Sequence, residues 1–122
     1  MNKTLHYITE ERCKDFEKKL NRLLTKDRIY LDADLTVDTL ASKLKTNTTY
    51  LYYYMHDVLK TKFYTIVNTR RVEDAKTMLK ESEIKLDIIA TKCGFNSTRS
   101  FMRVFKNVVG MTPTEWRIAN KD

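Results

Sequence analysis

Arg99 and Arg103 are four positions apart in a stretch of helix-forming composition, so both side chains project from the same helical face. A guanidinium group is planar and can bond bidentately to O6 and N7 of guanine in the major groove of DNA. Fifty residues earlier, a second stretch has polar and aromatic side chains at the same spacing. The outward positions that correspond are Thr49, Tyr52, Tyr53 and His56 in the first stretch, and Arg99, Met102, Arg103 and Lys106 in the second.

The other outward side chains also suit contacts with nucleic acid. Met102 and the methyl group of Thr49 are expected to lie against thymine methyl groups. Three consecutive tyrosines cannot all point inward at steps of about 100°, so Tyr52 and Tyr53 are predicted to face outward, where they can pack on a base or bond a phosphate. The side chains predicted to contact phosphates, and so to set affinity and salt dependence, are Lys43, Lys45, His56, Arg71, Lys92 and Lys106.

These two faces lie in two copies of one sequence pattern. Residues 35–43 match residues 84–92 at an offset of 49. Because a loop tolerates a one-residue slip, the pattern indicates a duplicated helix–turn–helix and not a repeat array. Beyond the turn the offset is 50, and the matching pairs are Leu51 with Phe101, Met55 with Phe105, and Ile66 with Trp116.

Each copy has the local signals of two short helices joined by a turn, the geometry that places the second helix in a major groove. Thr36 is the predicted N-cap of the first helix, and Asn47 that of a second helix over about residues 48–58. In the second copy Gly94 permits the positive φ of a sharp turn, and Asn96 is the predicted cap. The predicted core faces are Val37, Leu40, Ala41, Leu44, Leu51, Met55 and Val58 in the first copy, and Leu86, Ile89, Ala90, Cys93, Phe101, Phe105 and Val108 in the second.

The remaining segments predict further helices. Residues 10–25 have apolar side chains at helical spacing, and residues 63–80 contain neither glycine nor proline and predict one long helix between the copies. Thr112 to Glu115 form a capping box with Pro113 at the first helical position, and Trp116 is expected to anchor the last helix in the core. The predicted organisation is an N-terminal segment (1–9), a first helix-turn-helix lobe (10–61), a linker helix (62–81) and a second lobe (82–120).

The composition favours an all-α chain with a polyanionic partner. Of 122 residues 42% are hydrophobic, enough for a core, whereas two glycines and one proline are too few turn residues for an all-β fold. The net charge of +7 suggests nucleic acid or an acidic membrane. Cys13 and Cys93 lack metal-ligand spacing, and Cys93 is predicted to be a buried apolar group. Neither metal, cofactor nor membrane insertion is expected, and a cytoplasmic, nucleoid-associated location is the simplest expectation.

Three classes of function stay open at this point, and an enzyme is not among them. The sequence has no glycine-rich phosphate loop, no metal cluster and no nucleophile with an evident histidine partner. A sequence-specific regulator, a non-specific architectural DNA-binding protein and a protein–protein interaction domain remain. Arg71 has an alternative to a phosphate contact, because it can pair with an acidic residue of its own helix.

The stretch IATKCGFNSTRSFMRVFKNVVGMTPTEWR resembles the signature of the AraC/XylS family of bacterial transcription regulators. The resemblance covers about residues 10–118 and extends to the central segment NTRRVEDAKTML. It departs from the family pattern mainly in the first copy, where Tyr52 to Tyr54 replace a small-polar, arginine and apolar run, Met55 replaces a phenylalanine, and Lys45 and Lys60 stand where glycine is common.

The resemblance implies about seven helices, with two recognition helices in successive major-groove segments on one face of a double-stranded promoter or operator. Family members often have a sensor or dimerisation region before this domain, for which residues 1–9 are too short. The chain is therefore expected to be either a stand-alone regulator or the output part of a larger sensor protein, and RNA polymerase is a further expected partner. The base-contacting positions that the resemblance implies are Thr49, Tyr52, Tyr53, Thr98, Arg99, Met102 and Arg103.

Overall fold

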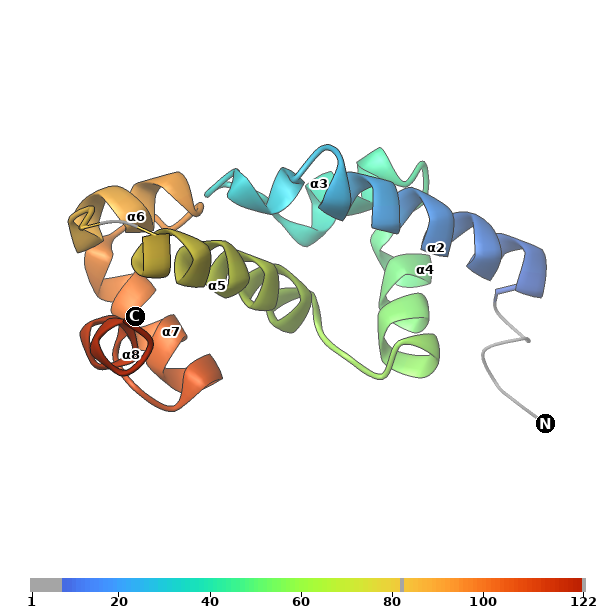
Figure 1. Ribbon diagram of the computed structural model, residues 1–122. Helices are drawn as coiled ribbons and strands as arrows, with labels where there is room; N and C mark the ends of the chain where they lie inside the picture. The colour runs from blue at the N-terminus through green and yellow to red at the C-terminus, as the bar shows by residue number, and fades with distance from the viewer. Residues whose placement is uncertain (1–7, 82, 122) are drawn as a thin grey trace. The chain divides into compact units, whose positions relative to one another are not determined.

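The computed structural model describes residues 8–81 and 83–121, and within these ranges it is all-helical, as predicted. It has seven α-helices, α2 to α8, and no strand among the described residues (Figure 1). Residues 1–7 of the predicted N-terminal segment lie outside the described ranges. The helices are α2 (Glu10–Thr25), α3 (Val37–Lys43), α4 (Thr48–Tyr53), α5 (Phe63–Glu81), α6 (Leu86–Lys92), α7 (Thr98–Val109) and α8 (Pro113–Ala119), with a 3₁₀ turn η1 (Ile29–Leu31) and a π-helical turn η2 (Tyr54–Val58).

The chain divides into two compact units, each with one helix-turn-helix. Unit 1 consists of residues up to Ile29 together with Asp34–Ile66, and unit 2 consists of Tyr30–Ala33 together with Val67 onward. Helix α5 therefore begins in unit 1 and continues into unit 2 without a break. The predicted lobe limits, 10–61 and 82–120, stay predictions.

In unit 1 the predicted N-caps of α3 and α4 are confirmed. The Thr36 side chain accepts a hydrogen bond from the Thr39 amide, and that of Asn47 accepts one from the Tyr50 amide, at 3.1 and 3.0 Å. Each cap satisfies an amide that has no partner inside its own helix. The predicted helix 10–25 is α2, whose buried side chains are Phe16, Leu20 and Leu24.

The second helix of unit 1 differs from its prediction. The sequence predicts one helix over about 48–58 with Val58 inward, but α4 ends at Tyr53 and continues as η2, where the Leu59 amide bonds the Tyr54 carbonyl oxygen at 3.0 Å. A π-helical turn contains more residues than an α-helical one, so the residues after it are rotated relative to an α-helix. Tyr54 is consequently buried against Phe16, with ring centroids 5.2 Å apart, and Val58 is 37% exposed.

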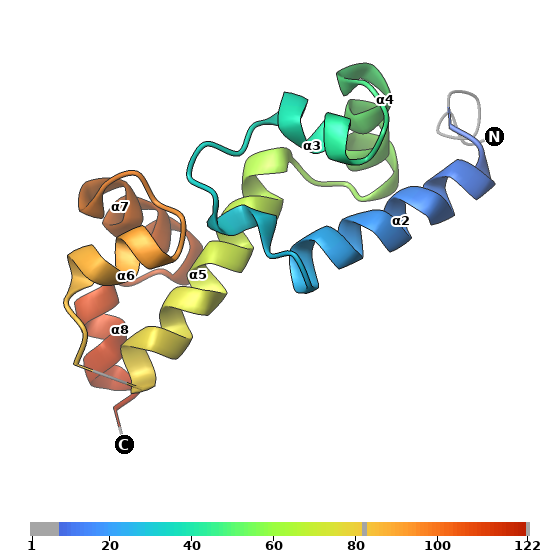
Figure 2. The same ribbon diagram turned by 90° about the horizontal axis from the view of Figure 1, so that it is seen from above.

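In unit 2 the helices α5, α6, α7 and α8 lie together (Figure 2). The first three bury one apolar cluster, against which Trp116 of α8 packs. The predicted capping box and Pro113 at the start of α8 are confirmed. The N-cap of α7 is Ser97, and the prediction of Asn96 is wrong by one residue because the Ser97 hydroxyl accepts from the Ser100 amide. The cluster consists of Val72, Ala75, Leu79, Ile89, Ala90, Cys93, Phe95, Phe101 and Phe105.

The inward prediction for Val108 is also wrong, since its side chain is 46% exposed while Val109 packs against the cluster. Phe105 of α7 contacts Trp116 of α8 edge to face, with ring centroids 6.2 Å apart. Val109 follows Phe105 by four positions and so lies on the same face of the helix, whereas the side chain of Val108 is exposed.

The turns inside the two helix-turn-helix motifs share a backbone hydrogen bond and a residue with positive φ. In unit 2 the Phe95 amide bonds the Ala90 carbonyl, and in unit 1 the Thr46 amide bonds the Ala41 carbonyl, both at 2.9 Å. The predicted positive φ of Gly94 is confirmed at +91°, and the equivalent residue of unit 1 is Lys45 with φ +57°. The duplication therefore extends to the left-handed residue of each turn, although only the second copy has glycine there.

Candidate nucleic-acid interface

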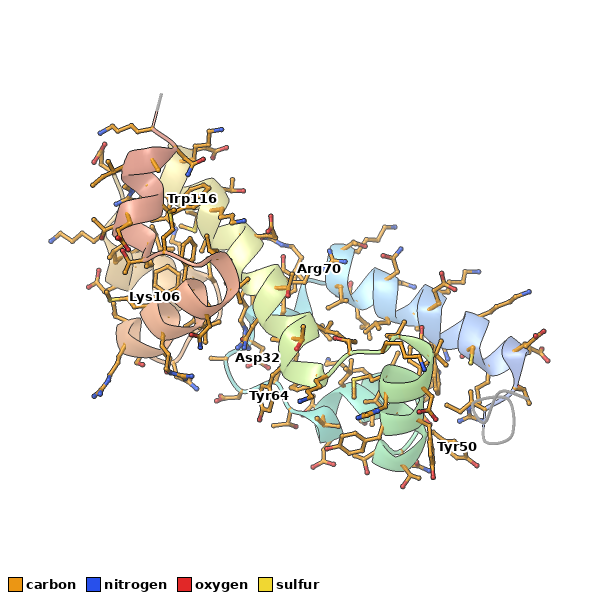
Figure 3. All side chains as sticks on the ribbon, turned by 90° about the horizontal axis from the view of Figure 1, so that it is seen from below. Asp32, Tyr50, Tyr64, Arg70, Lys106 and Trp116 are labelled. Atoms are coloured by element: carbon orange, nitrogen blue, oxygen red, sulfur yellow. The ribbon has the colours of Figure 1, made fainter. Side chains whose placement is uncertain are left out.

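Helix α7 presents a predicted contact face to solvent. Phe101 and Phe105 are completely buried on one side of the helix, which fixes the opposite side as the outer one. Thr98, in the first position of α7, is half-buried, and Lys92 at the end of α6 is exposed. Lys106 can be located on α7 in Figure 3. The predicted outward residues that are exposed on α7 are Arg99, Met102, Arg103 and Lys106.

Unit 1 has a corresponding face of different chemistry. Tyr52 is 55% exposed on α4, whereas Tyr53 is half-buried and Tyr54 is in the core, so the tyrosine run is divided among three environments. Burial, with smaller contributions from Glu17 and Cys13, raises the pKa of Tyr54 to about 12. The other predicted contact residues of unit 1, all exposed, are Lys43, Lys45, Thr49 and His56.

Arg12 of α2 holds the beginning of α4. Its guanidinium carbon lies 5.1 Å from the ring centroid of Tyr50, and its Nη2 donates to the Thr46 hydroxyl at 3.3 Å. A cation over an aromatic ring is attracted by the ring's quadrupole, so this contact joins Tyr50 of α4 to α2 (Tyr50 is labelled in Figure 3). No spacing in the sequence indicates this pairing of residues distant along the chain.

Arg71 is engaged inside unit 2. Its Nε donates to the Tyr30 carbonyl oxygen at 2.6 Å, its Nη2 donates to the Asp32 carbonyl oxygen at 2.9 Å, and its guanidinium lies 5.7 Å from the ring centroid of Phe95. Burial lowers the pKa of the Arg71 guanidinium from its ordinary value, and Asp32 partly offsets this. The side chain fastens the segment Tyr30–Ala33 onto unit 2, so these contacts favour a structural role over the predicted phosphate contact.

The polar residues that follow η2 have no role predicted from the sequence. Lys60 and Lys62 are exposed beside His56, and Tyr64, at the start of α5, is 72% exposed. We call His56, Lys60, Thr61, Lys62 and Tyr64 the η2–α5 corner. Lys60 itself was the sequence feature that could have indicated this corner, because it occupies a position where the second copy has Gly110.

Within residues 8–81 and 83–121, none of the helices is long and apolar enough to cross a membrane. In the same ranges no group of three or more His, Cys, Asp or Glu side chains is placed to hold a metal ion.

Two helix-turn-helix motifs, each with a solvent-facing second helix, define a DNA-binding module. The family model described as a helix-turn-helix domain matches residues 40–119, which is most of the chain. The chain belongs to this family and is an AraC-type helix-turn-helix DNA-binding domain, in agreement with the resemblance in its sequence.

The curated relatives are transcriptional regulators and not enzymes. An uncharacterized helix-turn-helix-type transcriptional regulator of Staphylococcus aureus is 28% identical over 101 residues, which is 83% of this chain and 14% of the relative. The regulator YtdP of Bacillus subtilis is 30% identical over 86 residues, 70% of this chain and 11% of the relative. The chain thus spans only a small part of the length of these relatives.

Three solved structures of similar fold are a DNA-binding domain and the C-terminal domains of two response regulators. The C-terminal domain of AraT from Geobacillus stearothermophilus has a TM-score of 0.79 at 21% identity, with 88% of this chain and 87% of that chain covered. The C-terminal domain of yesN from Fusobacterium nucleatum has a TM-score of 0.73 at 28% identity, with 83% of this chain and 95% of that chain covered. The DNA-binding domain of AdpA, solved in complex with a target DNA, has a TM-score of 0.74 at 21% identity, with 85% of this chain and 90% of that chain covered.

Proposed function

We propose that this domain binds double-stranded DNA sequence-specifically and regulates transcription, with α7 and the α4–η2 helix entering successive major-groove segments. The observation that supports this most directly is the division of α7 into a wholly buried face and an exposed face containing Arg99 and Arg103. A helix held by its apolar face keeps both arginines on its exposed side, from which their guanidinium groups can reach base edges.

The two helices are proposed to recognise bases by different chemistry. On α7 the two arginines suit guanine, and Met102 between them, 39% exposed, suits a thymine methyl group. On α4 the exposed Tyr52 offers a ring and a hydroxyl in place of a guanidinium, so unit 1 is expected to discriminate less sharply among bases. The remaining proposed base contacts are Thr49, Tyr53 and Thr98, and the proposed phosphate contacts are Lys43, Lys45, His56, Lys92 and Lys106.

The likeness to longer regulators supports a wider proposal about the whole protein. Because the chain corresponds to 14% and 11% of two curated regulators, it is proposed to be the output part of a larger sensor protein. Control of transcription through RNA polymerase is part of the same proposal. The AdpA domain was solved on a target DNA, which supports promoter or operator DNA as the ligand here.

The test is an unbiased selection from random duplex DNA at a fixed salt concentration of roughly 0.1 M. We expect an enriched site with two conserved blocks whose centres are about one helical turn, roughly 34 Å, apart. The net charge of +7 also favours a non-specific architectural mode, and selection without any enriched sequence, despite salt-sensitive binding, would establish that alternative. Absence of DNA binding at low salt contradicts both.

A further inference from the structure

The η2–α5 corner surrounds two adjoining hollows on the surface of unit 1. The first, of about 280 Å³, has a floor of buried Met55 and Phe63 and a rim of exposed Tyr52 and Tyr64. The second, of about 360 Å³, is lined by the polar and charged residues His56, Asp57, Lys60, Thr61 and Lys62. Both hollows include His56, Thr61 and Lys62, so an apolar, aromatic compartment opens directly beside a cationic one.

Lys60 occupies its position in an unfavourable backbone conformation. Its φ is +54°, whereas the equivalent residue of unit 2 is Gly110 with φ +93°. A Cβ on Gly110 would meet nothing within 4 Å, so the left-handed backbone, and not lack of space, is what favours glycine at this point of the repeat. A lysine in this conformation lowers the stability of the fold. Such a loss of stability is expected at a position where the side chain has a function.

The backbone of η2 holds the corner next to the predicted contact face. The Thr61 amide donates to the Met55 carbonyl oxygen at 2.9 Å, which brings the residues after the π-helical turn back to the end of the helix that contains Tyr52 and His56. Within the described part of unit 2 the equivalent helix, α7, is regular and ends at Gly110. The corner is therefore a feature of the first copy alone, and π-helical turns are frequent at functional sites.

We propose that the η2–α5 corner is an additional DNA-backbone site, in which Lys60 and Lys62 bind a phosphate and Tyr64 donates its hydroxyl to the same strand. This inference rests on the proposed function and assigns three residues to it beyond those already named. Two lysines and one carboxylate, that of Asp57, line the second hollow, so it has an excess of positive charge. The apolar compartment between Tyr52 and Tyr64 suits the deoxyribose that follows a phosphate along a strand.

The experiment compares Lys60→Gly and Lys62→Gln with the wild-type domain on the duplex that the wild type selects. Each lost phosphate contact lowers the slope of log affinity against log salt by about 0.9, which corresponds to about fivefold weaker binding at roughly 0.15 M salt. Lys60→Gly should in addition raise the midpoint of thermal unfolding by about 2–4 °C, because glycine relieves the left-handed lysine. Weaker DNA binding by a more stable protein separates loss of a contact from loss of structure.

Lys18→Gln, a charge change at an exposed position of α2, is the matched control and should leave affinity and slope unchanged. The inference is overturned if Lys60→Gly and Lys62→Gln keep the wild-type affinity and slope on a duplex that the wild type still selects. A wild type that selects no duplex instead defeats the proposed function. Inorganic phosphate could instead cause saturable NMR shifts of the amides of Lys60 to Tyr64 while both variants keep the wild-type DNA affinity. That result would assign the site to a free anion and overturn the DNA assignment.

Discussion

Replacement of Arg71 by methionine tests how unit 2 holds the segment Tyr30–Ala33. Methionine keeps an unbranched apolar stem but removes the guanidinium, which donates to the carbonyl oxygens of Tyr30 and Asp32 at 2.6 and 2.9 Å. The same segment is also fastened by the Tyr30 hydroxyl, which donates to Asp74 Oδ2 at 2.8 Å and remains in the variant.

The expected loss of stability follows from these contacts. A hydrogen bond from a charged donor contributes about 1.5–3 kcal/mol, and the lower end applies here because Arg71 is only half-buried. Two such bonds, together with about 0.5 kcal/mol from the contact of the guanidinium with the Phe95 ring, give a loss of about 3.5 kcal/mol. Arg70→Met, at the preceding position of α5, changes a half-buried arginine without a comparable pair of bonds and should cost no more than about 0.5 kcal/mol (Figure 3).

Urea denaturation of both variants, followed by circular dichroism, measures the two free energies of unfolding. A loss below about 1 kcal/mol for Arg71→Met, or an equal loss for Arg70→Met, would refute this account of the contact. The salt slope of DNA binding gives an independent readout, because a guanidinium engaged inside unit 2 makes no phosphate contact. Folded Arg71→Met should keep the wild-type slope, and a slope lower by about 0.9 would assign Arg71 to a phosphate instead.

Three further predictions concern turn residues and a helix cap. Lys45→Gly, at φ +57°, should raise the free energy of unfolding by up to about 1 kcal/mol and lower the salt slope by about 1, both measurable in one titration series. Gly94→Ala should lower the free energy of unfolding by over about 2 kcal/mol, and Gly110→Ala by about 1 kcal/mol, because a Cβ on residue 94 would lie 2.6 Å from a carbonyl oxygen. Equal losses of stability in thermal unfolding would contradict this. The hydrogen bond from the Thr112 amide lowers the pKa of Glu115. Glu115→Ala should therefore be less stable than the wild type above the carboxyl's ordinary pKa, and this difference in stability should disappear as pH falls through the lowered pKa. A difference in stability that does not depend on pH would exclude this cause.

The sequence predicted those features that depend on local chemistry. The caps at Thr36 and Asn47, the capping box before α8 and the uninterrupted helix α5 each require only residues close together in the chain. The burial of Phe101 and Phe105 follows from helical period together with the repeat, which also correctly predicted the exposed side of α7.

Features that depend on tertiary packing were not predictable in this way. The π-helical turn η2 accompanies the burial of Tyr54 against Phe16, a residue of another helix, and this shifted the expected place of Val58. The bonds of Arg71 to a segment about forty positions earlier have no signal in the spacing of the sequence. Apart from His56, the residues of the η2–α5 corner were missed for the same reason, because the helical period assumed for residues 48–58 ends at Tyr53.

The central claim is that the exposed face of α7 recognises bases, and Arg103→Ala tests it most directly. The measurement is the ratio of affinities for the selected duplex and for random duplex of equal length, at one salt concentration, with Lys18→Gln as control. We expect Arg103→Ala to lose about 1–3 kcal/mol on the selected duplex, and to relax base preference in one block while its binding to random DNA changes much less. An unchanged affinity ratio together with an unchanged base preference would contradict the account.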